Sequence, residues 1–398
     1  MASVRSGLDV LVAEGMQRLA GRRTALLGHP ASVDARFTHL LEACREHGVD
    51  LVRLFGPEHG LLGDAQDMAH VGGHKDGRTG IEVVSLYGPT RDSLFLKPEH
   101  LDGVDVLVCD LQDIGSRYYT FAYTIAFALR ACAARGVRCV VLDRPNPIDG
   151  VHVEGNVVGE RQRSFVGEYA LANRHGLTLG ELCRFFMKAD GLEGKLDVDI
   201  VWMDGWRRPM SFGDTGLPWV LPSPNMPTPD TALVYPGACL FEGTNLSEGR
   251  GTTRPFEIVG APYVEDAHRF AAIASAQDLP GCALRPCFFR PTFQKHAGQL
   301  CGGLQIHVVD RARFDALKTG VAILVAARAA AGANGFDWRR STYEYVSDRL
   351  AVDLLFGSDE PRKMIDDGKR ADDVMRALEP ERARFADERR AFLHAGYT

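Results

Sequence analysis

Short apolar segments recur along the first half of the chain, and each clear one from residue 51 onward ends in polar residues with glycine or proline. The segments that we interpret as strands cover residues 24–29, 51–55, 81–86, 105–110, 137–142 and 198–202. A helical pattern over 37–47 separates the first two, and this β-α-β order predicts a parallel sheet with a right-handed crossover. Ligands of open α/β sheets bind beyond the carboxyl ends of the strands. The sequence therefore predicts an α/β domain with its site at that edge.

The second half of the chain has a different pattern, and a length of 398 residues argues for two domains. We expect residues 1–235 to form the α/β catalytic domain and residues 236–398 to form a smaller α+β domain. Its expected helices and strands cover residues 264–276, 287–289, 303–309, 313–331 and 370–394. Residues 206–255 are rich in Pro, Gly, Thr and Asn and should make little regular structure. Their aromatic anchors favour a loop wall that faces the sheet edge over an interdomain linker.

Composition excludes several classes of protein. Lys and Arg total 46 against 52 for Asp and Glu, so the chain lacks the basic footprint of a nucleic-acid-binding protein. There is no apolar run of about 18 residues that could span a membrane. The nine cysteines lie mostly in apolar runs without a Cys-x-x-Cys pair, which indicates reduced, buried thiols and disfavours structural zinc. Since the start lacks the apolar core of a signal peptide, we expect a cytoplasmic protein, or an exported one whose leader was removed.

Known phosphate-binding motifs are also missing. No Gly-x-Gly-x-x-Gly follows the first strand, and no Gly-x-x-x-x-Gly-Lys-Ser/Thr occurs. We therefore expect no nucleotide and no other cofactor.

Glu58 and His59 lie just past the strand 51–55, between glycines, and they are candidates for acid/base chemistry. The alternative interpretation of Glu58 is a cap of the next turn. Hydrolysis of a glycosidic bond needs one carboxylic acid to protonate the leaving oxygen and a second group as nucleophile or as base for water. We assign the first role to Glu58. The candidates for the second role, which the sequence does not rank, are Asp110, Asp113, Glu242 and Glu248.

Four arginines lie at strand ends or in the glycine-rich loop: Arg117, Arg144, Arg250 and Arg254. A guanidinium binds a carboxylate through two hydrogen bonds, so these arginines suggest a substrate that carries a carboxylate. Salt bridges to neighbouring acidic residues are an equally good interpretation of any one of them. The polar residues that complete the expected substrate-binding set are Gln112, Asp113, Asn225, Asn245 and Glu248.

Two other kinds of catalysis are less well supported. The loop 56–80 contains His59, Asp64, Asp67, His70 and His74, which could hold a metal in a hydrolase. Their spacing does not match a helix face around an open zinc site, so we expect no metal. A nucleophilic serine is disfavoured because no Gly-x-Ser-x-Gly occurs. A non-catalytic protein that binds sugars is a further alternative.

Seven ordered blocks carry a resemblance to a known family over the chain from about residue 7 to its end. They cover residues 54–60, 85–88, 110–115, 142–147, 174–178, 222–227 and 241–256. Together they closely resemble the NamZ-like exo-β-N-acetylmuramidases. The chain departs from many relatives at Gly28-His29, where they have a Thr-Asn pair.

The resemblance implies a glycoside hydrolase that releases N-acetylmuramic acid from the non-reducing end of peptidoglycan fragments. The substrate would be a muropeptide or a MurNAc-GlcNAc saccharide. The implied architecture is a Rossmann-like N-terminal domain without nucleotide, a smaller C-terminal domain and a cleft between them. The family's proposed proton donor falls on Glu58, and the lactyl carboxylate of muramic acid would call for an arginine.

Overall fold

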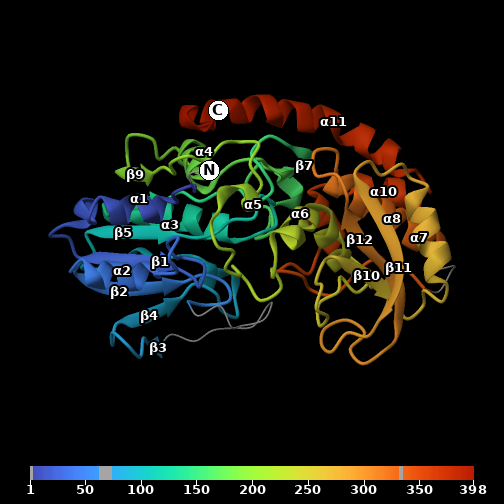
Figure 1. Cartoon of the computed structure of the whole chain (residues 1–398), viewed down its shortest axis with the longest axis horizontal. Helices are drawn as coiled ribbons and strands as arrows, with labels where there is room; N and C mark the ends of the chain where they lie inside the picture. The colour runs from blue at the N-terminus through green and yellow to red at the C-terminus, as the bar shows by residue number, and fades with distance from the viewer. Residues whose placement is uncertain (1–2, 62–73, 331–334) are drawn as a thin grey trace.

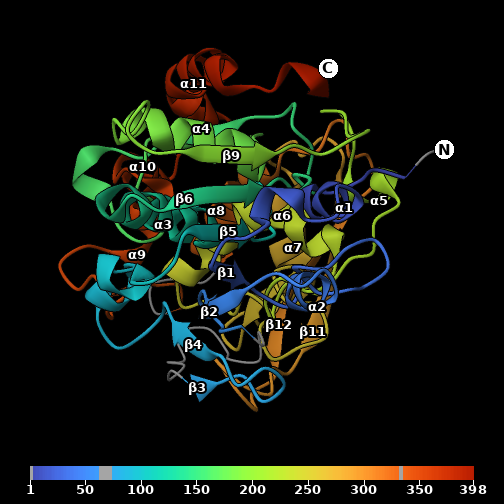
Figure 2. The ribbon, with the colours of Figure 1, turned by 90° about the vertical axis from the view of Figure 1, so that its left-hand side faces the viewer.

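The computed structural model describes residues 3–61, 74–330 and 335–398. Its N-terminal part is built on a seven-stranded sheet with the order β3-β4-β2-β1-β5-β6-β9 (Figures 1 and 2). The strands are β1 (Thr24–Gly28), β2 (Leu51–Gly56), β3 (His74–Lys75), β4 (Glu82–Ser85), β5 (Val106–Asp110), β6 (Arg138–Leu142) and β9 (Val198–Val201). All neighbours pair in parallel except β3, which runs antiparallel to β4. The expected α/β fold with a parallel sheet is confirmed.

Helices cover both faces of this sheet, because its buried strands are apolar on both sides. Helices α1 (Gly7–Ala13) and α2 (Leu40–Glu46) pack on one face, where Leu26, Leu54 and Val140 contribute to the core. Helices α3 (Phe121–Arg135) and α4 (Leu179–Ala189) pack on the other, with Leu27 and Phe55. Figure 2 shows α1 and α2 on the opposite side of the strands from α3.

Two helix starts differ in how well the sequence predicts them. Thr178 caps α4, and the side chains of Thr178 and Glu181 form the expected capping box. Helix α3, by contrast, begins at Phe121 and not at residues 115–117 as its pattern indicated. Gly115 has a φ of 81°, and a Cβ there would lie 2.5 Å from Oδ1 of Asn146. This close approach keeps the segment before α3 irregular and directs it past the end of the sheet.

The C-terminal part is a three-stranded antiparallel sheet, β10-β12-β11, covered by helices (Figure 1). Its main elements are α6 (Pro229–Ala238), β10 (Ile258–Ala261), α7 (Ala267–Ser275), β11 (Cys282–Phe289), β12 (Cys301–Val308) and α8 (Ala316–Ala330). The remaining helices are α9 (Ala351–Phe356), α10 (Glu360–Asp366) and α11 (Ala371–Glu388). A small antiparallel pair, β7 (Glu154–Val157) with β8 (Ala172–Arg174), lies between β6 and β9 in sequence.

The segment 206–255 has more regular structure than its composition indicates. It contains α5 (Phe212–Thr215), α6 and the 3-10 helix η5 (Cys239–Gly243). Gly237, which resembles a loop signal in sequence, allows α6 to touch α8: a Cβ on Gly237 would lie 1.8 Å from the carbonyl oxygen of Ala316. The boundary that we expected after residue 235 therefore lies inside a packed helix.

The last residues of the chain return to the N-terminal part. Helix α11 runs above both parts, and the 3-10 helices η7 (Arg389–Phe392) and η8 (Ala395–Tyr397) follow it (Figure 1). The hydroxyl of Tyr397 donates a hydrogen bond of 2.6 Å to Asp143, which follows β6. The single helix expected over 370–394 thus ends at Glu388. Among the described residues, no helix combines the length and apolar character that crossing a membrane requires.

Candidate active site

A cavity between the two parts of the molecule holds the residue that the sequence singles out first, Glu58. The space between its walls, counted together with the solvent at its open side, is about 520 Å³. Its N-terminal walls come from the loop after β2 and the segment before α3. Its C-terminal walls come from α6, η5, the loop 250–256 and the loop 343–344.

Glu58 owes its position to a tight loop at the carboxyl end of β2. The N–H of Gly60 donates to the carbonyl oxygen of Pro57 at 2.9 Å, and His59 has a φ of 68°. A Cβ on Gly56 would lie 2.5 Å from the nitrogen of Leu61, so only glycine permits the chain to fold back here. The loop leaves Glu58 buried, with 7% of its surface exposed, at the wall of the cavity.

The hydroxyl of Thr120 donates a 2.7 Å hydrogen bond to Oε2 of Glu58. Thr120 is the N-cap residue of α3, yet its side chain makes no capping bond to the helix. Threonine at this position usually accepts from the helix backbone. Here it donates to a carboxyl group at the wall of the cavity instead.

His59 also lines the cavity, beside Phe121. The two rings meet edge to face, with centroids 6.4 Å apart and an interplanar angle of 80°. A left-handed backbone conformation is costly for a histidine, and such strain is frequent at functional sites. The structure thus brings together the pair Glu58 and His59 that the sequence predicts.

On the opposite wall, Glu242 is held by two donors. Nη2 of Arg250 lies 2.6 Å from its Oε1, and the hydroxyl of Tyr343 donates to its Oε2 at 2.7 Å. Nε of Arg250 also lies 3.3 Å from Glu248, which in turn pairs with Lys295 at 2.9 Å. Although burial opposes ionisation, these two cations hold the pKa of Glu248 below its usual value. Glu242 and Arg250 therefore enter the cavity as a charged, hydrogen-bonded pair.

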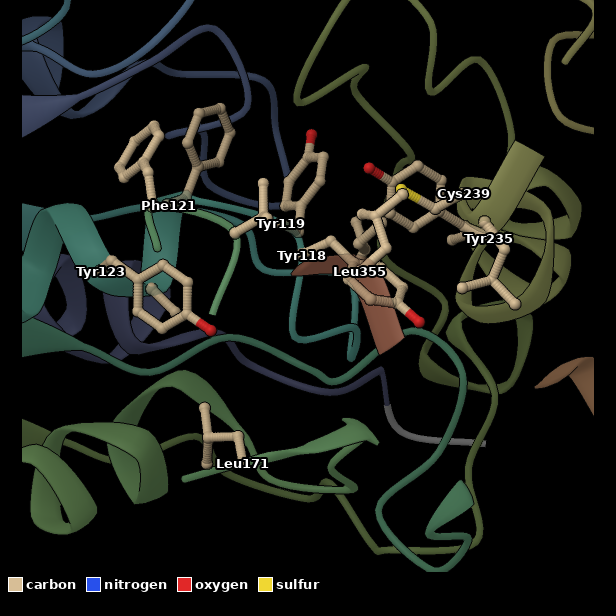
Figure 3. Packing of buried hydrophobic residues seen from close by; sticks show 14 of the residues in the cluster. Tyr118, Tyr119, Phe121, Tyr123, Leu171, Tyr235, Cys239 and Leu355 are labelled. Carbon is tan, nitrogen blue, oxygen red and sulfur yellow. The ribbon is translucent and has the colours of Figure 1, made fainter. Parts of the chain in front are cut away.

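Aromatic side chains complete the walls. Figure 3 shows Tyr119, from the segment before α3, close to Tyr235 of α6; their rings are 6.0 Å apart and nearly perpendicular. The guanidinium of Arg250 lies 5.0 Å from the ring centre of Phe256. Burial raises the pKa of the Tyr119 and Tyr235 hydroxyls, so both stay protonated. Such walls offer apolar faces together with neutral hydrogen-bonding groups.

Asp110, Gln112 and Arg144 lie elsewhere, and the expectation that Asp110 joins Glu58 is not met. Asp110 is fully buried, and both its oxygens accept hydrogen bonds from the guanidinium of Arg144, one of them at 2.7 Å. The side chain of Gln112 donates to the carbonyl oxygen of Pro145 at 2.9 Å. Gln112 and Arg144 line a separate small hollow near Trp219. The ends of β5 and β6 are adjacent, so their polar groups pair with each other.

The contacts of Arg117 and Asp113 stabilise the fold and do not contribute to the cavity. The guanidinium of Arg117 is buried and donates to the carbonyl oxygens of Asn156, Leu171 and Leu355. Asp113 accepts a 2.7 Å hydrogen bond from the N–H of Gly115. Neither residue lines the cavity, because both are used to fix the irregular segment before α3.

Asn245 and Arg254 also lie outside the cavity. The side chain of Asn245 donates to the carbonyl oxygen of Gly335 at 2.7 Å and accepts from the hydroxyl of Tyr263 at 2.8 Å. Arg254 is half exposed and pairs with Glu257 at 3.2 Å, beside a different surface hollow. Asn225, by contrast, lines the cavity with Glu58, as expected.

Sequence reasoning missed two residues that line the cavity from the loop after α8, Tyr343 and Glu344. They belong to a Ser-Thr-Tyr-Glu-Tyr run that has no strand end or glycine cluster beside it. Thr120 was also missed, because the sequence pattern predicts that it lies inside a helix. No local sequence pattern marks Thr120, Tyr343 or Glu344, because only the tertiary fold brings these residues to the cavity.

The metal hypothesis depends on residues that the structure mostly does not describe. Asp64, Asp67 and His70 lie outside the described residues. Within the described part of the chain there is no group of three or more His, Cys, Asp or Glu side chains arranged to hold a metal ion.

Two models of one protein family match the two halves of the chain. The N-terminal model of the exo-β-N-acetylmuramidase NamZ matches residues 24–230, and its C-terminal model matches residues 233–394. The peptidoglycan β-N-acetylmuramidase NamZ of Bacillus subtilis is 40% identical over 391 residues, 98% of this chain and 91% of that protein.

Two crystal structures of DUF1343 family proteins from Bacteroides fragilis are similar throughout. One has a TM-score of 0.88 at 30% identity, with 99% of each chain covered. The other has a TM-score of 0.76 at 26% identity, covering 98% of this chain and 99% of its own. With both halves matched in order, the chain belongs to the NamZ exo-β-N-acetylmuramidase family.

Proposed function

We propose that this protein is an exo-β-N-acetylmuramidase that releases N-acetylmuramic acid from the non-reducing end of peptidoglycan fragments. Membership of the family over both halves of the chain supports this activity. The observation that carries it is the buried carboxyl group of Glu58 in a cavity whose walls come from both parts of the molecule.

Glu58 is the general acid in this proposal. Its Oε2 is held by the hydroxyl of Thr120, so Oε1 is the oxygen that carries the proton to be transferred. As the bond between C1 of the sugar and the glycosidic oxygen breaks, that proton passes to the leaving oxygen. Burial beside Phe121 keeps bulk water away from the proton.

Arg250 is the substrate-binding arginine. Among the described residues that line the cavity it is the one guanidinium, and the lactyl carboxylate of muramic acid would be its partner. Glu242 and Glu248 hold the guanidinium in place. The aromatic side chains around it would pack against the sugar ring.

Replacement of Glu58 by glutamine tests the role of the acid. The variant should fold normally and hydrolyse a MurNAc-GlcNAc disaccharide at least about 100-fold more slowly than the wild type, because acid/base groups typically contribute this much. The loss should be smaller on a nitrophenyl β-N-acetylmuramide, whose leaving group needs little protonation. Mass spectrometry of the products and absorbance of the released nitrophenol give the two rates.

The matched control is Glu99→Gln, an exposed glutamate in the 3-10 helix η3 (Pro98–Leu101). It should leave both rates unchanged. Near-normal activity of Glu58→Gln on the disaccharide would refute the assignment of the acid. Binding of the disaccharide by the wild type without any sugar release overnight would indicate a sugar-binding protein instead.

A further inference from the structure

A strained turn in the C-terminal part has a sequence that does not suit its conformation. Residues 343–346 form a two-residue turn in which Tyr343 and Val346 exchange backbone hydrogen bonds of 2.9 Å. The central residues, Glu344 and Tyr345, have φ angles of 44° and 65°. Turns with two positive φ angles strongly favour Asn-Gly. A glutamate and a tyrosine here are costly, and such strain points to a functional constraint.

The turn places Glu344 in the cavity. Only 5% of the residue is exposed, and it lines the same cavity as Glu58. The hydroxyl of Tyr345 donates to the carbonyl oxygen of Gly88 at 2.9 Å, which fixes the turn to the N-terminal part. The ring of Tyr345 also packs against Tyr87, at 6.1 Å between centroids. The turn is therefore held from both parts of the molecule.

The carboxylates of Glu58 and Glu344 both raise the pKa of the same two neighbouring tyrosine hydroxyls. Burial raises the pKa of Tyr345 to about 12, and the negative charges of Glu344 and Glu58 both add to this effect. The pKa of Tyr87 is raised by burial and by the same two carboxylates. Glu58 and Glu344 therefore lie within electrostatic reach of one pair of side chains, although they come from opposite parts of the chain.

Glu242, the other cavity carboxylate, is poorly suited to react. Both of its oxygens accept hydrogen bonds, one from Arg250 and one from Tyr343. A carboxylate bound in this way is a weak base and a weak nucleophile. Its position fits a residue that orients Arg250.

We infer that Glu344 is the second catalytic carboxylate, acting as general base across the bound sugar from Glu58; this rests on the function proposed above. Glu344 removes a proton from a water molecule as the water oxygen bonds to C1. The bond between C1 and the glycosidic oxygen breaks, and that oxygen takes the proton of Glu58. The products are the free sugar and the shortened saccharide; exchange with solvent returns a proton to Glu58 and removes one from Glu344.

The decisive variant is Glu344→Gly, because glycine removes the carboxylate and suits the left-handed conformation. It should keep or raise the melting temperature and lower the hydrolysis of a nitrophenyl β-N-acetylmuramide by at least about 100-fold. Sodium azide should restore release of nitrophenol and form the α-glycosyl azide, detected by NMR. The wild type should release the α anomer of the sugar first.

The control is Gln294→Gly. Gln294 also has a positive φ, of 64°, but it is exposed and does not line the cavity. This variant should keep or raise the melting temperature without loss of activity.

Four results would overturn the role of Glu344: normal activity of Glu344→Gly, no rescue by azide, a β-glycosyl azide, or initial release of the β anomer by the wild type. If Glu344→Gly does not fold, Glu344→Gln takes its place, and normal activity of that variant overturns the role. A wild-type protein that releases no muramic acid would instead contradict the proposed function, so the two failures are distinguishable.

Discussion

At the scale of single residues, we propose that the selectivity of the site depends on Arg250. Its guanidinium has a short contact with Glu242, a longer one with Glu248 and a face against Phe256. These contacts fix its plane, so little side-chain entropy is lost when it binds a further carboxylate. Lysine would keep the charge but lose the planar, two-pronged geometry.

We therefore expect Arg250→Lys to lose selectivity for muramic acid. N-acetylmuramic acid differs from N-acetylglucosamine by the lactyl group, and a charge-assisted hydrogen bond to it should make inhibition of the wild type about 10-fold tighter or better. In Arg250→Lys the inhibition constants of the two sugars should come within about threefold of each other. Inhibition of nitrophenyl substrate hydrolysis measures both. An unchanged ratio would assign the lactyl group to another residue.

At the scale of elements, Asp143 joins strand β6, helix α4 and the C-terminal segment. It accepts hydrogen bonds from the N–H of Gly180 at 2.7 Å, the hydroxyl of Thr178 at 3.0 Å and the hydroxyl of Tyr397 at 2.6 Å. Burial nevertheless dominates and raises the pKa of Asp143 to about 7. The folded state thus favours the protonated form of this carboxyl group.

The raised pKa of Asp143 makes the free energy of unfolding depend on pH. An unfolded aspartate has a pKa of about 3.9. Between about pH 4 and 7 the folded state therefore binds more protons at Asp143, and the contribution of this group to stability falls as the pH rises. The pKa of Asp315 is also raised to about 7, chiefly by burial, and it adds to the same slope. Relative to the wild type, Asp143→Asn should therefore gain free energy of unfolding as the pH rises across this range, as measured by urea denaturation at several pH values. Parallel curves for variant and wild type would refute the role of Asp143.

At the scale of the whole molecule, the C-terminal segment fixes the two walls of the cavity relative to each other. Helix α11 leads out of the C-terminal part, and Arg389 then donates to the carbonyl oxygens of Val151 and Gly176 in the N-terminal part, at 2.6 and 2.8 Å. Glu58 and Glu344 come from these two different parts. We therefore expect the geometry of the site to depend in part on contacts at the far end of the chain.

Two adjacent arginines test this role. Arg389 is buried, whereas the side chain of Arg390 is 76% exposed. Arg389→Met leaves buried carbonyl groups without donors and should lower the free energy of unfolding by roughly 2–4 kcal/mol. Arg390→Met should change it by less than about 0.5 kcal/mol. Chemical denaturation of both variants gives the comparison, and equal effects would contradict a specific role for Arg389.

The sequence by itself determined the elements and the first catalytic candidate. Apolar runs such as 51–55 and 105–110 form buried parallel strands, and Thr178 with Glu181 begins α4, because these features depend on interactions within a few residues. The same short-range sequence pattern predicted that Glu58 lies just beyond the end of β2.

Only the tertiary structure decided which polar groups share a cavity. Asp110 and Arg144 lie on adjacent strand ends and pair with each other, while Glu344 reaches the cavity from a distant loop. A local pattern cannot carry this information, because the distance between side chains on different elements is set by how those elements pack. The same holds for α6. In the sequence Gly237 suggests a loop, and only the close packing of α8 explains why a glycine lies in this helix.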